Sequence, residues 1–165
     1  MNLKAITLLV GKFKKYLGKG GGTDTLFIYE AQHHFQENWD MDTSDFVAMY
    51  DASLQCSTTK RLWIGDNYFP KEMIMKFGKL QGDFVPFLFK DLFYETNNIV
   101  GRMDRFIFHC DELLREYKDA HPASVENNHF HDDDYWMTSL YLAFRYPDQY
   151  TLYSASAFRD FLKYP

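Results

Sequence analysis

The sequence predicts an all-α protein, a compact bundle of about seven or eight helices around an aromatic-rich core. Apolar residues recur every three or four positions in most segments, which is the spacing of one helix face. The segments between them are short and rich in Gly, Pro, Asn and Asp. Aromatic residues make up 19% of the 165 residues, and large rings bury much area each. A chain of this length is therefore expected to bury a substantial core as one domain.

Residues 1–22 are expected to form a basic helix and a glycine-rich connector. Apolar side chains fall at helical spacing from Ile6 to Leu17. The following segment, 18–22, holds four glycines and one lysine. This composition ends a helix and is typical of a flexible connector. Residues 23–165 are expected to form a single helical domain.

Two helices are expected after the connector. Asp24 is the expected N-cap of the first, which carries Ile28, Ala31, Phe35 and Trp39 on one face. The second begins near Asp42-Thr43 and ends before the polar segment 55–60. Residues 61–69 are expected to be irregular, with a turn at 65–67.

The middle of the chain gives the clearest helix signals. Pro70 suits the first turn of a helix. Segment 84–93 is apolar enough for a buried strand, but an early Pro86 and the apolar spacing favour a helix. The longest helix is expected over Asn98–Ala120, with Arg102 among the residues of its polar side. Its apolar stripe comprises Ile99, Met103, Phe106, Ile107, Cys110, Leu113, Leu114 and Tyr117.

Two further helices are expected near the end of the sequence. His121-Pro122 ends the long helix, because the residue before a proline disfavours helical backbone. Asp132, Asp133 and Asp134 suit the start of the next helix, where the macrodipole favours acids. Pro147 ends it, and a last short helix is expected near 156–163.

Charge is divided unevenly along the chain. Residues 1–22 carry five lysines and no acid, a charge of +5, and the remaining 13 basic and 23 acidic residues give −10. An acidic body repels a phosphate backbone. Only the first segment therefore offers a binding footprint for DNA, and its candidate contacts are Lys12, Lys14, Lys15 and Lys19. The alternative is that these lysines are only a solvated helix face.

The cysteines and the first residues indicate a cytoplasmic protein without a membrane anchor. Cys56 and Cys110 are the only cysteines, no CxxC occurs, and such usage suits a reducing compartment. Cys110 lies in the apolar stripe, where a thiol is inert, whereas Cys56 is expected in a polar loop. The apolar run 5–10 is too short to span a bilayer and lacks the flanks of a signal peptide.

No catalytic motif is complete, so we expect no enzymatic activity and no cofactor. Gly11 and Gly18 do not form a phosphate loop, which needs GxxxxGK[ST] after a strand. His129 and His131, followed by three aspartates, are the best metal candidates, since imidazole and carboxylate both bind transition metals. Their spacing puts both on one side only in an extended segment, and a helix start with bonded histidines explains them equally. His33 and His34 point about 100° apart on a helix and suit structural roles.

Several long strings resemble the N-terminal region of bacterial AAA+ proteins of the McrB type, the GTP-hydrolysing subunits of modification-dependent restriction systems. The resemblance begins near residue 24 and covers nearly all that follows. It is carried by HFQENWDMDTSDFVAMYDASL (34–54), KRLW (60–63), FPKEMIMKF (69–77), FVPFLFKDLF (84–93), GRMDRFIFHCDELLREY (101–117) and ENNHFHDDDYWMTSLYLAFRYPDQYTLY (126–153). In such proteins the motor lies downstream, so the resemblance implies a leading domain, or a short relative without a motor, and it transfers no catalytic residue.

Three functional hypotheses follow. The first is a nucleic-acid-targeting domain of a defence ATPase, which uses the basic segment and stacks bases on exposed rings. The candidate rings are Trp39, Trp63, Tyr68 and Trp136, with core packing as the alternative for each. The second is an interaction or structural module, whose acidic body docks onto a partner such as an AAA+ motor or a nuclease subunit, or onto a downstream domain of its own. The third is a metal hydrolase at His129, His131 and the aspartates 132–134.

Overall fold

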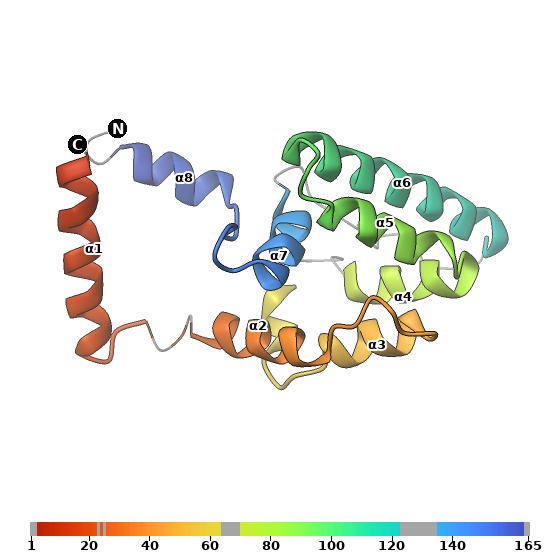
Figure 1. Cartoon of the computed structure of the whole chain (residues 1–165), viewed down its shortest axis with the longest axis horizontal. Coiled ribbons are helices and arrows are strands. Elements are labelled where there is room, and N and C mark those ends of the chain that lie inside the picture. The colour runs from red at the N-terminus through yellow and green to blue at the C-terminus, as the bar shows by residue number, and fades with distance from the viewer. Residues whose placement is uncertain (1–2, 23, 25, 64–69, 123–134, 164–165) are drawn as a thin grey trace.

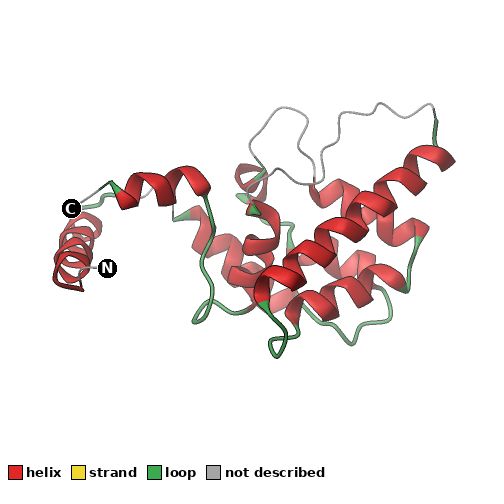
Figure 2. Cartoon of the chain, turned by 90° about the horizontal axis from the view of Figure 1, so that it is seen from above, coloured by secondary structure: helices red, strands yellow, loops and turns green. Residues whose placement is uncertain are grey.

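A computed structural model describes residues 3–22, 24, 26–63, 70–122 and 135–163, and every regular element among them is a helix (Figures 1 and 2). The predicted all-α class is thus confirmed. In chain order the helices are α1 (Leu3–Gly18), α2 (Phe27–Asn38), α3 (Phe46–Ser53), the 3-10 turn η1 (Thr59–Leu62), α4 (Pro70–Leu80), α5 (Phe84–Phe93), α6 (Ile99–Ala120), α7 (Trp136–Arg145) and α8 (Ala155–Leu162).

Helices α2 to α7 form the packed body. Helix α2 packs on α3 and α7, α4 packs on α3, α5 and α6, and α5, α6 and α7 pack on one another. Helices α1 and α8 belong to none of these pairs and have no buried residue. Figure 1 shows them at one end of the molecule, away from α6. The body therefore folds around a core to which α1 and α8 contribute little.

The core is a continuous cluster of rings. Trp39 stacks on Phe35 with their centroids 4.6 Å apart and meets Phe89 at 5.3 Å. Phe89 also contacts Phe106 edge to face at 5.0 Å and Tyr141 at the same distance. Edge-to-face pairs add to the stabilisation that burial alone provides. The predicted aromatic-rich core is thus confirmed, with rings from α2, α5, α6 and α7.

The predicted helix starts after the connector need correction. Helix α2 begins at Phe27, and Leu26, not Asp24, occupies its N-cap position. Helix α3 begins at Phe46 rather than near residue 42. The physical reason is a local turn: the backbone N–H of Asp42 donates to Asp40 Oδ1, and Asp45 then caps the helix by accepting from the Ala48 N–H at 3.0 Å.

The starts at Pro70 and Asn98 are confirmed, and the side chain of Asn98 accepts from the N–H of Gly101. Segment 84–93 is a helix, as Pro86 indicated. The first described residue before α7 is Tyr135, which has a left-handed backbone with φ of 61°. The aspartates predicted to start that helix, 132–134, lie outside the described residues.

The polar side assigned to α6 is wrong at Arg102, which is 1% exposed. Its Nη1 donates to the Leu92 carbonyl at 2.7 Å and its Nη2 to the Tyr150 hydroxyl at 2.9 Å. A buried charge must be hydrogen-bonded to be tolerated, and these two acceptors come from α5 and from the chain after α7. Arg102 therefore ties three parts of the body together. Ile99, predicted in the apolar stripe, is exposed.

Candidate functional site

Helix α1 presents an apolar stripe that the described residues leave largely uncovered. At 100° per residue, Ile6, Val10, Phe13 and Leu17 share one side of the helix. Such a stripe usually faces a core, yet Phe13 is 54% exposed and Val10 and Leu17 are exposed as well. Phe13 and Tyr16 stack with centroids 6.4 Å apart. An exposed apolar patch of this kind is typical of a surface that binds a partner.

The lysines predicted to bind DNA lie in and directly after the second half of α1. Lys12, Lys14 and Lys15 fall within one turn and Lys19 follows the helix directly, and all four are exposed. No acid occurs in this segment to neutralise them. At 100° per residue, Lys12 and Lys15 lie on the side of α1 away from the apolar stripe, whereas Lys14 borders the stripe. These exposed lysines are suited to an anionic partner.

The glycines after α1 make a tight turn. Gly20 and Gly22 have positive φ angles of 80° and 76°, which only glycine adopts without strain. A Cβ on Gly21 would lie 2.4 Å from the ring of Tyr16, so a side chain at this position would require that ring to move. The N–H groups of Lys19 and Gly21 both donate to the Tyr16 carbonyl. The turn therefore closes the C-terminal end of α1.

A cleft of about 300 Å³ separates the end of α1 from the body. Phe13 and Leu17 line one wall, and Leu26, Ile28 and Leu152 lie among the residues of the body that face them. The lining is largely apolar on both sides. A segment with apolar side chains would find contacts here with α1 and with the body at once.

Helix α8 repeats the pattern of α1 near the same end of the molecule (Figure 2). Phe158, Phe161 and Leu162 share one side of α8 and are all exposed. Arg159 and Asp160 lie on the other side. The sequence predicted a short helix near 156–163, and the structure adds that its apolar side is exposed.

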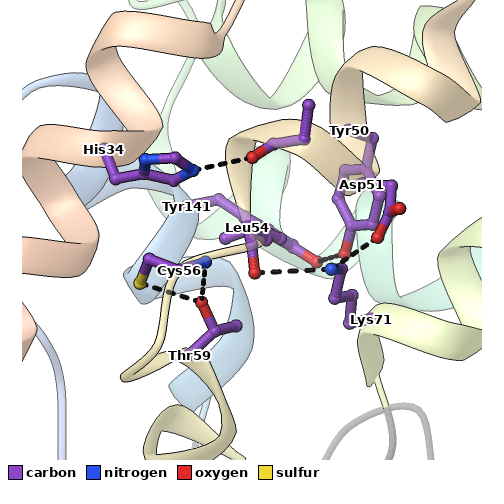
Figure 3. A network of polar contacts seen from close by, with 9 residues as sticks. His34, Tyr50, Asp51, Leu54, Cys56, Thr59, Lys71 and Tyr141 are labelled. Carbon is purple, nitrogen blue, oxygen red and sulfur yellow. Dashed lines mark hydrogen bonds and ion pairs between the residues drawn. The ribbon is translucent and has the colours of Figure 1, made fainter.

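Cys56 lines a cavity of about 460 Å³, together with Lys60, Trp63 and Lys71. Its Sγ is 3.1 Å from the Thr59 hydroxyl, which accepts from the Cys56 N–H and has its own proton left for the sulfur (Figure 3). Burial raises the pKa of this thiol, but hydrogen bonds with Thr58 and Thr59 lower the pKa by more than burial raises it. The pKa of Cys56 is therefore below the ordinary value.

Two groups near Cys56, His34 and Lys71, make polar contacts with other residues. The nearest labelled imidazole in Figure 3, His34, is hydrogen-bonded to the Ala52 carbonyl at 2.9 Å. Lys71 is held by Asp51 at 2.6 Å, and its ammonium also donates to the Leu54 carbonyl. A thiol is activated by a positioned base or a free cation, and here the base is bound elsewhere and the cation is paired. Cys110 is fully buried, which raises its pKa well above the ordinary value, as its place in the stripe predicted.

The structure bears on two further predictions, that exposed rings stack on bases and that His129 and His131 bind a metal. Trp39 is 7% exposed and belongs to the core, so its proposed base-stacking role is wrong. Trp63 and Trp136 are half-buried, and Tyr68 lies outside the described residues. Within the described part of the chain, no three His, Cys, Asp or Glu side chains gather as metal ligands do. His129 and His131 also lie outside it.

No family model, no curated protein and no solved structure matches this chain. The likeness to McrB-type proteins therefore stays a hypothesis. Among the helices of the described residues, none combines the length and the apolar character needed to cross a bilayer.

Proposed function

We propose that the chain is a non-catalytic docking module, in which the body of α2 to α7 is a scaffold and α1 binds a partner protein. The observation that carries this proposal is the exposed apolar stripe of α1, with Phe13 54% exposed beside the cleft. A helix of 16 residues with one apolar side gains most of its stability from packing that side against something. The body does not supply that packing, so a partner is expected to.

A protein fits this surface better than nucleic acid alone. Phosphates would satisfy the lysines but would leave the apolar stripe in water. A protein helix or groove with acidic margins satisfies both sides of α1. The acidic body, at −10, adds repulsion toward a polyanion of DNA's length.

The resemblance to the N-terminal regions of McrB-type proteins supports a role in a restriction or defence AAA+ system. In such a system, the module would dock onto the motor or onto the nuclease subunit. Target recognition by DNA binding is the second candidate function. It is favoured by one observation, the exposed row of Lys12, Lys14, Lys15 and Lys19.

A photo-crosslinking residue at position 13 tests the proposal in cells that produce the full chain. Phe13 tolerates an aromatic crosslinker, because the ring is exposed. Tyr94 is the matched control, since it is 56% exposed and lies in the turn after α5. We expect adducts to protein from position 13 and none from position 94. Adducts to nucleic acid only, or equal adducts from both positions, would overturn the docking role.

A further inference from the structure

Helices α5 and α6 carry a second uncovered surface, whose chemistry complements that of α1. We call it the α5–α6 face, and it comprises Phe84, Phe87, Phe108, Glu112, Glu116 and Asp119. Phe87 is 57% exposed and Phe108 is 54% exposed. Phe84 stacks on Phe87, and the ring of His109 bridges Phe84 and Phe108 with centroids 5.3 Å from each. The rings thus form one aromatic patch.

Acidic side chains border this patch. Glu112, Glu116 and Asp119 line a groove of about 590 Å³ with Phe84, and Arg115 is the one basic residue of its lining. All three acids are exposed. Glu112 faces His109 at 3.4 Å, and Glu116 accepts from the Gln81 amide at 3.2 Å. These weak surface contacts leave both carboxylates open to a stronger cationic partner.

We propose that α1 of one copy of this chain binds the α5–α6 face of a second copy. The inference rests on the docking role proposed for α1 and names its partner. The apolar stripe of α1 meets the rings of Phe87 and Phe108, and Lys14, which borders the stripe, meets Glu112 and Glu116. Lys12 and Lys15 lie further from the contact and add longer-range attraction to these acids. Both the charge and the apolar character of the two surfaces are complementary, which is the combination that gives an interface its specificity.

The same contact is not available within one copy. Helix α1 lies at one end of the long axis of the molecule, and the C-terminal half of α6 lies at the other (Figure 1). The helix pairs that pack together include no pair of α1 with α5 or α6. A head-to-tail contact of this kind closes into a dimer if both copies exchange α1, and extends into a chain of copies if they do not.

Charge exchange between two variants tests this pairing. Variant one carries Lys12→Glu, Lys14→Glu and Lys15→Glu, and variant two carries Glu112→Lys and Glu116→Lys. Each variant then has like charges on both surfaces. All five residues are exposed, so neither variant should change the melting temperature of the body. A control variant carries Asp42→Lys and Glu95→Lys, two exposed acids outside the α5–α6 face.

Sedimentation velocity over a range of concentrations measures the association of each protein. We expect the wild type and the control to associate, and each of the other two variants to associate roughly tenfold more weakly, because the close charge pairs across the contact change from attraction to repulsion. A mixture of variants one and two should associate again, since each supplies the charges that the other lost. About a tenfold rise in salt should weaken all of these contacts, since it shortens the screening length about threefold.

Three results would overturn the inference. They are a monomeric wild type at every concentration, association of variant two equal to that of the control, and no recovery in the mixture. The crosslinking experiment separates this failure from failure of the docking role. If position 13 joins a protein of a different mass, α1 remains a docking helix and only the identity of its partner is wrong.

Discussion

Phe106 provides a test of how the body is packed. The residue is 1% exposed on α6, and its ring meets Phe89 edge to face at 5.0 Å and Tyr141 at 6.0 Å. Burying a Phe side chain contributes roughly 1.5–3 kcal/mol. Each edge-to-face contact adds about 0.5–1.5 kcal/mol. Phe106→Ala removes both contributions and opens a cavity, so it should lower the free energy of unfolding by roughly 3–5 kcal/mol.

Phe108→Ala is the matched control, since it makes the same chemical change two residues further along the same helix. Phe108 is 54% exposed, and its truncation should change the free energy of unfolding by less than about 0.5 kcal/mol. In a thermal melt at high salt, Phe106→Ala should lower Tm by about 6–20 °C for a domain of this size. Equal melting temperatures for the two variants would show that the orientation of α6 is wrong.

Three other predictions follow from the described contacts. Arg102→Ala should lower the free energy of unfolding in urea by roughly 2–4 kcal/mol, since it removes two buried charge-assisted hydrogen bonds. An unchanged urea midpoint would show that these hydrogen bonds of Arg102 do not stabilise the body. Cys56 should react with iodoacetamide at a lower pH than an ordinary thiol, because its lowered pKa forms the thiolate earlier, and Cys110 should react only after unfolding; equal rates for both would contradict this. Any binding to DNA should be lost when Lys12, Lys14 and Lys15 are changed to Glu. In the wild type, the logarithm of the association constant should fall with the logarithm of the salt concentration at a slope of about −3, because each phosphate contact contributes about −0.9. DNA binding that does not depend on salt would instead indicate a site in the body.

Local signals predicted the helices of the body well. Pro70 and Asn98 mark the starts of α4 and α6, because one fixes the first helical turn and the other caps it. The prediction that Asp24 caps a helix was wrong, because a residue type that suits an N-cap shows only that a helix can begin there. Helix α3 begins later than predicted because of the turn at Asp40 and Asp42. This turn depends on the hydrogen bond from the Asp42 N–H to the Asp40 side chain, which residue type alone does not specify.

Distant contacts explain what the sequence did not predict. Arg102 is buried because Tyr150, 48 positions later, and the Leu92 carbonyl both accept from it. Trp39 is buried by rings from α3 and α5. The lysines of α1 were found from composition. An apolar stripe has the same spacing whether it is packed or exposed, so the exposure of this stripe could not be predicted from the sequence.

Hydrogen exchange tests the central claim that α1 is a docking helix. An isolated helix of about 12–15 residues is marginal in water, and α1, with 16, is little longer. At low protein concentration its amides should therefore exchange quickly while those of α6 stay protected. We expect protection of residues 3–18 to rise with protein concentration, in parallel with the Phe87 and Phe108 segments, and to be lost in the Lys12, Lys14 and Lys15 reversal. Protection of α1 that equals that of α6 at every concentration would contradict the account, because α1 would then be packed within a single copy.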